Sequence, residues 1–192
     1  MALRPLLLAL LAACAVVVSG CGNKQDVRTL GETEGIYVDV ADLSYQVQIS
    51  RVLNENDVED RAYLKGLPAG TAPPGRDETW FAIFIRVSNP SEQPKQPARS
   101  FRIVDTLENE YEPLALSAEE NPFAYDPRPL QPGRVYPDPN SVSGEGDIGG
   151  ALLLFKVKLQ SLQNRPLEFI IDSPLPPPLR EEGNSATIDL DV

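Results

Sequence analysis

The segment that decides the fold is ETWFAIFIRV, residues 78–87. It is dense in aromatic and β-branched side chains, which fit the pleated surface of a strand. Both alternating sets of side chains are apolar between Trp80 and Ile85, whereas a strand with one wet face alternates apolar and polar residues. The segment is therefore predicted to be a central strand that is covered on both sides.

Further strand signals lie before and after this segment. Residues 43–50 (LSYQVQIS) alternate between apolar and polar side chains, and residues 151–159 (ALLLFKVKL) form a second apolar run. We expect other strands over residues 36–40, 98–106, 111–116, 165–172 and 186–192, and an edge strand around residues 123–125. Asn56 or Asp57 can cap a short helix over residues 58–64.

This succession of elements predicts the fold class. About eight or nine short strands, with turn signals about every 8–12 residues, are typical of an antiparallel sandwich. No helices of 10–15 residues alternate with the strands, which argues against a βαβ architecture. We therefore expect an all-β antiparallel β-sandwich with one short helix.

Six large apolar side chains are expected to form the core. Each lies on an apolar face of a predicted strand, so we expect all of them to be buried and in mutual contact. They are Trp80, Phe84, Phe101, Leu153, Phe155 and Phe169.

The first 20 residues have the features of a targeting signal. A positive charge at Arg4 is followed by an apolar run that is shorter than the ~20 residues a membrane-spanning helix needs, which predicts a secretory signal peptide. The run ends in VSGC, residues 18–21, which resembles a bacterial lipobox. By that resemblance, Cys21 receives a diacylglyceryl group and becomes the first residue of the mature chain. An ordinary signal peptide that happens to contain a cysteine is the alternative.

These signals divide the chain into three parts. Residues 1–20 are expected to be the lipoprotein signal peptide, residues 21–35 a lipidated flexible tether, and residues 36–192 the sandwich domain. Acyl chains on Cys21 would anchor the protein on the extracytoplasmic face of a bacterial cell membrane. The formal net charge is −11, so an anionic membrane surface repels the domain, and we expect it to stand off on its tether.

Composition excludes several classes of site. The chain has no His, which excludes a Ser-His-Asp triad, a Cys-His dyad and imidazole metal ligands. Its two cysteines are Cys14 and Cys21, and cleavage between them leaves no internal disulfide. The acidic balance argues against a nucleic-acid partner, because a phosphate backbone requires clustered Lys and Arg. No phosphate loop or metal motif is present, so no cofactor is expected.

Carboxylates are the only abundant reactive groups. Glu110 and Glu112 lie two residues apart on a predicted strand, hence on one face, with Asp105 across a hairpin turn. One interpretation is a paired-carboxylate hydrolase site. The other, which we favour, is a solvated edge whose acidity discourages edge-to-edge pairing. A catalytic nucleophile would need a base to activate it. A Lys on a solvent-exposed strand face stays protonated and cannot serve as that base, so the sequence predicts that the protein has no catalytic activity.

Three further features have a functional and a structural interpretation. The oxygen-rich loops at residues 54–60 and 145–147 can bind calcium, or can serve helix capping and turns. The aromatic residues of 80–84 can form a ligand platform or belong to the core. The prolines of 174–178 can bind a partner as polyproline helix or connect rigidly to the last strand. We favour the structural interpretation of each.

The stretch WFAIFIRVSNPSEQPKQPARSFRIVDTLENEYEPL carries a family resemblance. Its layout is a V-x-N turn at residues 87–89, an F-x-[LIV]-x-D strand at 101–105 and an N-x-Y hairpin at 109–111. In this layout the chain resembles bacterial lipoproteins with an Ig-like extracellular domain of unknown function, the immunoprotective-extracellular-like family. The Gly-Gly pair at 149–150, followed by an apolar strand, also fits this group.

The resemblance implies a fold and a location but no chemistry. It covers about residues 36–192, and fold alone does not give function. The chain departs from the family layout in the hairpin turn, where Glu108-Asn109 stands in place of a Gly, and in a Pro-rich insertion at residues 117–140. The role of this insertion stays open.

The sequence thus leads to a function hypothesis with alternatives. We expect a lipid-anchored, extracytoplasmic Ig-like binding or assembly module that is not an enzyme. A carboxylate-dependent hydrolase acting on cell-wall material, a calcium-binding surface domain, and a spacer without ligand are the alternatives. The expected partners are the membrane, through the lipid on Cys21, and a protein of the cell envelope. Partner identity and oligomeric state are left open.

Overall fold

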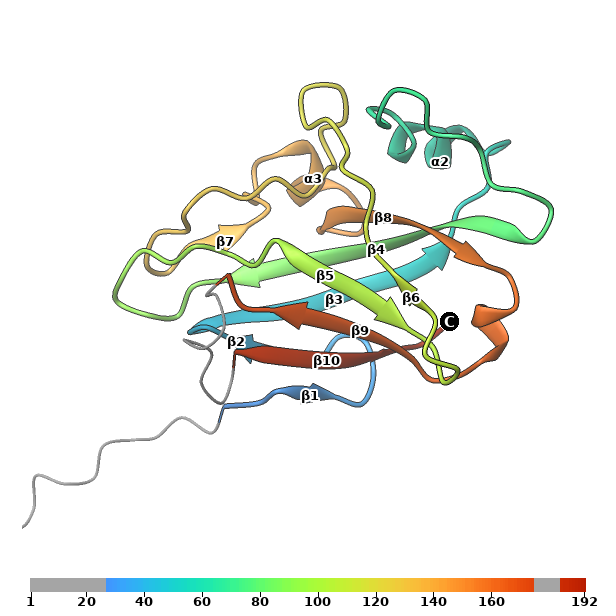
Figure 1. The fold of residues 1–192 in the computed structure, drawn as a ribbon. Coiled ribbons are helices and arrows are strands. Elements are labelled where there is room, and N and C mark those ends of the chain that lie inside the picture. The colour runs from blue at the N-terminus through green and yellow to red at the C-terminus, as the bar shows by residue number, and fades with distance from the viewer. Residues whose placement is uncertain (1–26, 175–183) are drawn as a thin grey trace, which may run out of the picture.

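The computed structural model describes residues 27–174 and 184–192 (Figure 1). These residues form ten β-strands in two five-stranded sheets, two short α-helices and one 3₁₀ helix. The predicted signal peptide, Cys21 and most of the Pro-rich segment of residues 174–183 lie outside the described residues. No helix in the described part of the chain is long and apolar enough to cross a membrane.

The first sheet has the strand order β1-β10-β9-β5-β6. Its strands are β1 (Leu30–Gly31), β5 (Ser100–Val104), β6 (Glu110–Tyr111), β9 (Leu167–Asp172) and β10 (Ser185–Leu190). Neighbours are antiparallel except for β1, which runs parallel to β10.

The second sheet is built around β4 (Glu78–Ser88), the strand predicted to be central. It pairs antiparallel with β3, β7 and β8, and β2 extends the sheet beyond β3. The remaining strands and the helices are β2 (Tyr37–Val40), β3 (Leu43–Val52), β7 (Val135–Tyr136), β8 (Ala151–Lys158), α2 (Val58–Tyr63), α3 (Val142–Glu145) and the 3₁₀ helix η1 (Ser161–Gln163).

Two apolar clusters lie on opposite faces of β4. Phe81, Ile83 and Ile85 face the first sheet and belong to the larger cluster, which fills the space between the two sheets. Trp80 and Phe84 face away from it and belong to a smaller outer cluster. The coverage of β4 on both sides is thus as the sequence predicted, and it follows from apolar residues at odd and even positions alike.

The expected mutual contact of six core residues is wrong in one respect. All six are buried. Four of them, Phe101, Leu153, Phe155 and Phe169, belong to the larger cluster, whereas Trp80 and Phe84 lie in the outer one. The strand itself separates the two groups, because successive side chains of a strand point to opposite faces.

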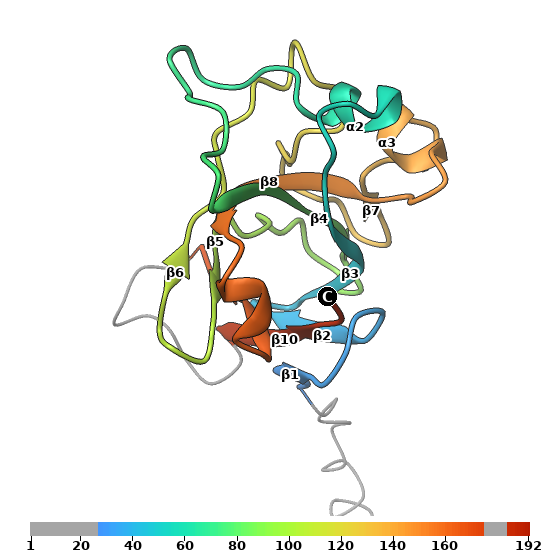
Figure 2. The same ribbon diagram turned by 90° about the vertical axis from the view of Figure 1, so that its right-hand side faces the viewer.

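The outer cluster is covered by α2 and by the chain that follows β6. Asp57 caps α2, as the sequence allowed, by accepting hydrogen bonds from the backbone N–H groups of Glu59 and Asp60. The Tyr63 ring then packs edge-on against Phe84, with centroids 4.9 Å apart. Figure 2 shows the result: α2 and α3 lie on one side of the second sheet, and β10 and β1 lie on the other.

Two tyrosines tie the start of β5 to the second sheet. The backbone N–H of Ala98 donates to Tyr45 Oη (2.8 Å), and Tyr125 Oη donates to the Ala98 carbonyl oxygen (2.9 Å). Tyr45 belongs to β3, so these bonds join the two layers of the sandwich at a buried backbone position.

The N-terminal boundary of the domain differs from the expected one. Arg28 N donates to the Asp39 carboxylate (3.1 Å), β1 pairs with β10, and the Glu34 carboxylate accepts hydrogen bonds from Ser50. From Arg28 onward the expected tether is therefore part of the domain. The sequence concealed this, because a two-residue strand has no period and depends on a partner at the other end of the chain.

The predicted all-β sandwich is confirmed, and the predicted helix over residues 58–64 is α2. Of the expected strand 111–116 only β6 is formed, and the expected edge strand near residue 124 is a single parallel bridge between Ala124 and Leu152. The long segment 117–149 is part of the folded domain, because it contributes β7 to the second sheet and α3 to the layer outside that sheet.

Candidate functional site

The carboxylates suggested by the sequence do not form a site. Asp105 is 4% exposed, and its carboxylate accepts hydrogen bonds from the backbone N–H groups of Leu107 and Asn109 and from the side-chain amides of Asn109 and Asn164. Burial raises its pKa, but the hydrogen bonds outweigh burial and hold the pKa well below its ordinary value. Asp105 is thus an ionised residue that builds a turn.

Glu110 and Glu112 are both exposed. Neither side chain makes a hydrogen bond or ion pair within the described residues, and Asp105 is occupied by the turn beside them. The hydrolase interpretation requires at least two acids that converge on a cleft. The positions of these three residues lend it no support.

The two oxygen-rich loops use their side chains locally. Asp57 caps α2, while Asp60 forms a buried ion pair with Arg51 and accepts from the backbone N–H of Asn54. In the other loop, Ser141 caps α3. Among residues 27–174 and 184–192, no group of three acidic or Cys side chains is placed to hold a metal ion.

A pocket beside α3 is a candidate site in the described part of the chain. Its volume is about 190 Å³. It lies between the outer face of the second sheet and the Gly-rich segment that leads from α3 into β8. Its lining residues are Gln48, Arg86, Pro137, Pro139, Gly144, Gly146, Asp147, Ile148 and Gly149.

Arg86, on β4, is the charged side chain that the second sheet contributes to the pocket. It shares an outward-facing side of β4 with Phe84, and it is half-buried. Its side chain makes no hydrogen bond and no ion pair with any described residue. By contrast, Arg51 and Arg102, each with a third of its side chain exposed, are paired with Asp60 and Asp172. Among the half-buried arginines of the described residues, Arg86 is therefore the one without a carboxylate partner.

Two glutamines beside Arg86 form an ordered row of amides. Gln46, which is paired with Arg86 across the strands, donates to the Gly35 carbonyl oxygen (2.6 Å). Gln48 in turn donates to Gln46 Oε1 (2.6 Å). The β-bulge between Val47 and Ile49 brings Gln48 to the pocket, as bulges re-aim side chains. The side-chain carbonyl oxygen of Gln48 has no donor among the described residues.

The wall of the pocket opposite Arg86 is formed by the segment between α3 and β8, whose backbone passes close to its neighbours. A Cβ at Gly144 would lie 2.0 Å from the Asp138 carbonyl oxygen, and one at Gly150 would lie 3.0 Å from Phe84 Cβ. Only glycine fits at position 144, and a Cβ at position 150 would force a shift of its neighbour on β4. Gly144, Gly146 and Gly149 line the pocket, so this segment forms its second wall.

This arrangement suits binding. Arg86 offers five N–H donors in a planar fork, and Gln48 and the exposed Asp147 offer acceptors. No Ser, Cys, Lys or Tyr is among the lining residues, and Asp147 is the one lining side chain of a type that can act as a nucleophile. Sequence reasoning missed Arg86, although its signal was present: it is the polar residue that interrupts the apolar face of the most apolar strand.

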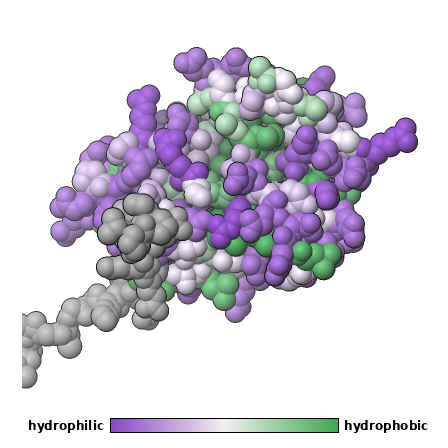
Figure 3. Space-filling model, viewed as in Figure 1, coloured by the Kyte–Doolittle hydropathy of each residue, from purple (hydrophilic) through white to green (hydrophobic). Residues whose placement is uncertain are grey.

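The visible face of the molecule offers no single large apolar patch. In Figure 3, hydrophobic side chains show as separate groups among hydrophilic ones. A pocket with defined polar groups is therefore a better candidate site than an apolar docking surface on this face.

Comparison with protein-family models finds no match, and comparison with curated proteins finds none either. Three solved structures are similar in fold. The yjhA protein of Bacillus subtilis has a TM-score of 0.49 at 11% identity, over 83% of this chain and 99% of that one. A β-sandwich protein of Clostridium difficile has 0.44 at 9% identity, over 88% and 98%.

The third similar structure is the Bacillus subtilis protein ycdA, described as a "putative lipoprotein", with a TM-score of 0.47 at 10% identity. The match covers 81% of this chain but 38% of ycdA, so the chain spans little more than a third of that protein. At these scores the likenesses carry no argument about function or family, and the β-sandwich rests on the two sheets described above.

Proposed function

We propose that this protein is a lipid-anchored binding module of the bacterial cell envelope. Its anchor is the lipid on Cys21, its ligand binds in the pocket at Arg86, and it performs no catalysis. The observation that carries the proposal is the half-buried guanidinium of Arg86, which has no partner in the described part of the chain.

An unpaired, partly buried charge is unfavourable for the folded protein. It loses some of its hydration, and within the described residues no carboxylate lies at ion-pair distance to offset the loss. The chain contains 28 Asp and Glu residues, and within the described residues the other half-buried arginines, Arg51 and Arg102, are paired with carboxylates. A charge left unpaired beside a pocket is the arrangement expected where the partner is a ligand.

The orientation of the domain agrees with this division of roles. The chain enters the domain at β1, and both views place β1 on the side opposite to α2 and α3 (Figures 1 and 2). Only seven residue steps separate Cys21 from Arg28, a span of at most ~25 Å when fully extended. A lipid at Cys21 would hold β1 toward the membrane and leave the pocket layer turned outward.

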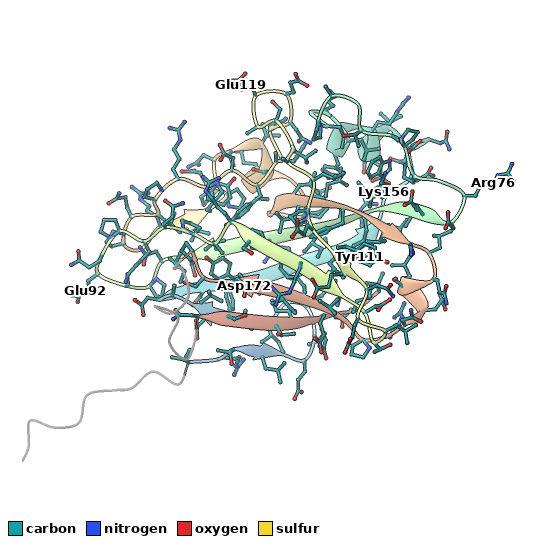
Figure 4. All side chains as sticks on the ribbon, in the orientation of Figure 1. Arg76, Glu92, Tyr111, Glu119, Lys156 and Asp172 are labelled. Carbon is teal, nitrogen blue, oxygen red and sulfur yellow. The ribbon has the colours of Figure 1, made fainter. Side chains whose placement is uncertain are left out.

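Capture from the cell envelope tests the proposal. Immobilised protein is incubated with solubilised envelope, and the retained material is compared for wild type, Arg86→Ala and Arg76→Ala. Arg76 extends from the loop before β4, away from the sheets, and serves as the matched loss of charge (Figure 4). We expect a ligand that wild type and Arg76→Ala retain and Arg86→Ala loses. Identical retention by all three contradicts a role for the pocket.

A further inference from the structure

We infer that the pocket binds the carboxylate end of a short peptide, with the carboxylate on Arg86 and the preceding backbone amide on the acceptors beside it. The inference rests on the proposed function and names the chemistry of its ligand. It follows from three properties of the pocket: its charge, its acceptors and its size.

The charge of the pocket selects a singly charged, planar anion. The guanidinium fork of Arg86 matches the two oxygens of a carboxylate and can bind both at once. Arg86 is the one basic side chain among the lining residues, and Asp147 lies at the same pocket. A phosphate group carries more charge than one Arg neutralises, and Asp147 repels it more strongly than it repels a singly charged carboxylate. A carboxylate is therefore favoured over a phosphate.

The acceptors select a ligand that also carries an N–H group. Gln48 donates one of its two amide hydrogens to Gln46, and its side-chain carbonyl oxygen has no donor among the described residues, so this oxygen can accept a hydrogen bond from a ligand. The Asp147 carboxylate adds a second acceptor. A carboxylate with a nitrogen one carbon away satisfies both sides of the pocket. This is the chemistry of an α-amino acid or of the last residue of a peptide.

The size of the pocket favours a small ligand. Its volume of about 190 Å³ is below the ~300–1,000 Å³ of pockets that enclose drug-sized ligands. Pro137, Pro139 and Ile148 supply apolar wall, which suits a small apolar side chain. The free amino group of an amino acid would be attracted by Asp147, whereas a peptide bond would donate a neutral N–H. Both sources share the carboxylate, and the test separates them.

Titration calorimetry on the purified full-length protein in detergent tests the inference. The probes are N-acetyl-Ala-Ala, the same peptide with a C-terminal amide, free alanine and inorganic phosphate. We expect saturable binding of the free-acid peptide and at least ~tenfold weaker binding of its amide, because the amide cannot form the charge-assisted pair. Arg86→Ala should abolish binding, Arg86→Lys should retain part of it, and Arg76→Ala should bind as wild type does.

Several outcomes would overturn the inference. These are equal binding of acid and amide, acid binding that survives in Arg86→Ala, stronger binding of phosphate, or binding of alanine without the peptide. If no peptide binds while capture from the envelope still depends on Arg86, the carboxylate inference fails and the proposed function stands. If neither occurs, both fail. Circular dichroism of each variant shows whether a loss reflects unfolding instead.

Discussion

At the scale of single residues, Asp105 and Arg86 are two charged side chains partly or fully removed from bulk water, and they differ in whether the described fold supplies a partner. Asp105 is surrounded by N–H donors of its own turn and of Asn164, so its charge is fully used by the fold. Arg86 is half-buried without a described partner. The sequence allowed a catalytic role for Asp105 as the less favoured interpretation, and the structure gives this residue a structural role in its turn. The sequence assigned Arg86 no role beyond its strand, although this residue is the one on which the proposed function rests.

The turn at Asp105 leads to a prediction about pH. Its pKa is lowered in the folded state, so it stabilises the fold while ionised, and this contribution is lost as pH falls from about 4 into the acid range. Asp105→Asn should cost about 2–4 kcal/mol at pH 7, because it replaces an acceptor of several hydrogen bonds. Urea unfolding measured from pH 7 to pH 3 should show a flatter acid decline for the variant.

Glu110→Gln is the control for this prediction. Glu110 is exposed and its side chain has no partner within the described residues, so its replacement should leave both the stability and its pH dependence nearly unchanged. If Asp105→Asn and wild type lose stability in parallel on acidification, Asp105 is not the group that the turn stabilises.

The tyrosine contacts at Ala98 give another prediction at this scale. Tyr45→Phe removes the acceptor of the buried Ala98 N–H and should cost about 1–3 kcal/mol of unfolding free energy. Tyr37→Phe alters a tyrosine that is 45% exposed and should have little effect. Chemical denaturation of both variants measures the difference. Equal stability of the two would mean that water replaces the Tyr45 hydroxyl.

At the scale of elements, the strands show what a sequence pattern reveals and what it hides. Apolar residues at every position of β4 from Trp80 to Ile85 predicted its central place, and the alternation in β3 predicted a half-buried strand. The same alternation implied that Trp80 and Phe81 face opposite ways, so the two clusters were predictable. β1 was not, because its two residues gain order only from pairing with β10.

The candidate site was less predictable than the fold. The pocket is formed by two strands, a bulge and a distant Gly-rich segment, and no local pattern shows that these meet. The bulge at Gln48 depends on the pairing of β3 with β4, and α3 has four residues. Helix capping at Asp57 was predictable because it involves only neighbours in the chain.

Phe155 on β8 tests the packing between the two sheets. It is fully buried in the larger cluster, so Phe155→Ala should lower the free energy of unfolding by about 3–5 kcal/mol. Lys158→Ala, at the exposed end of the same strand, should change it by less than ~0.5 kcal/mol. Denaturant unfolding compares the two. A loss below ~1 kcal/mol for Phe155→Ala would contradict the placement of this side chain between the layers.

At the scale of the whole molecule, the described chain begins on one side of the domain and the pocket lies toward the other. The chain enters at β1, on the side away from α2 and α3 (Figure 2). Because the domain begins at Arg28, the distance available between lipid and domain is about half of what a tether ending at residue 35 would give. We therefore expect the domain to sit closer to the membrane than the sequence alone suggested.

The anchor itself is tested in cells. Cys21→Ala removes the thiol that the lipobox resemblance assigns to lipidation, so the variant should not incorporate labelled fatty acid and should leave the membrane fraction. Arg86→Ala is the control and should remain lipidated and membrane-bound, since the pocket is remote from the anchor. A Cys21→Ala protein that is still acylated and sediments with membranes would refute the anchor.

The central claim is that Arg86 is a free guanidinium that a ligand occupies. The most direct test is modification of arginines in the native protein by a dicarbonyl reagent, followed by mass spectrometry of each site. Arg51 and Arg102 have a third of their side chains exposed but are paired with carboxylates, so they should react slowly. Arg86 should react much faster, and N-acetyl-Ala-Ala should protect Arg86 alone. An Arg86 as unreactive as Arg102, or one that the peptide leaves unprotected, would contradict the account.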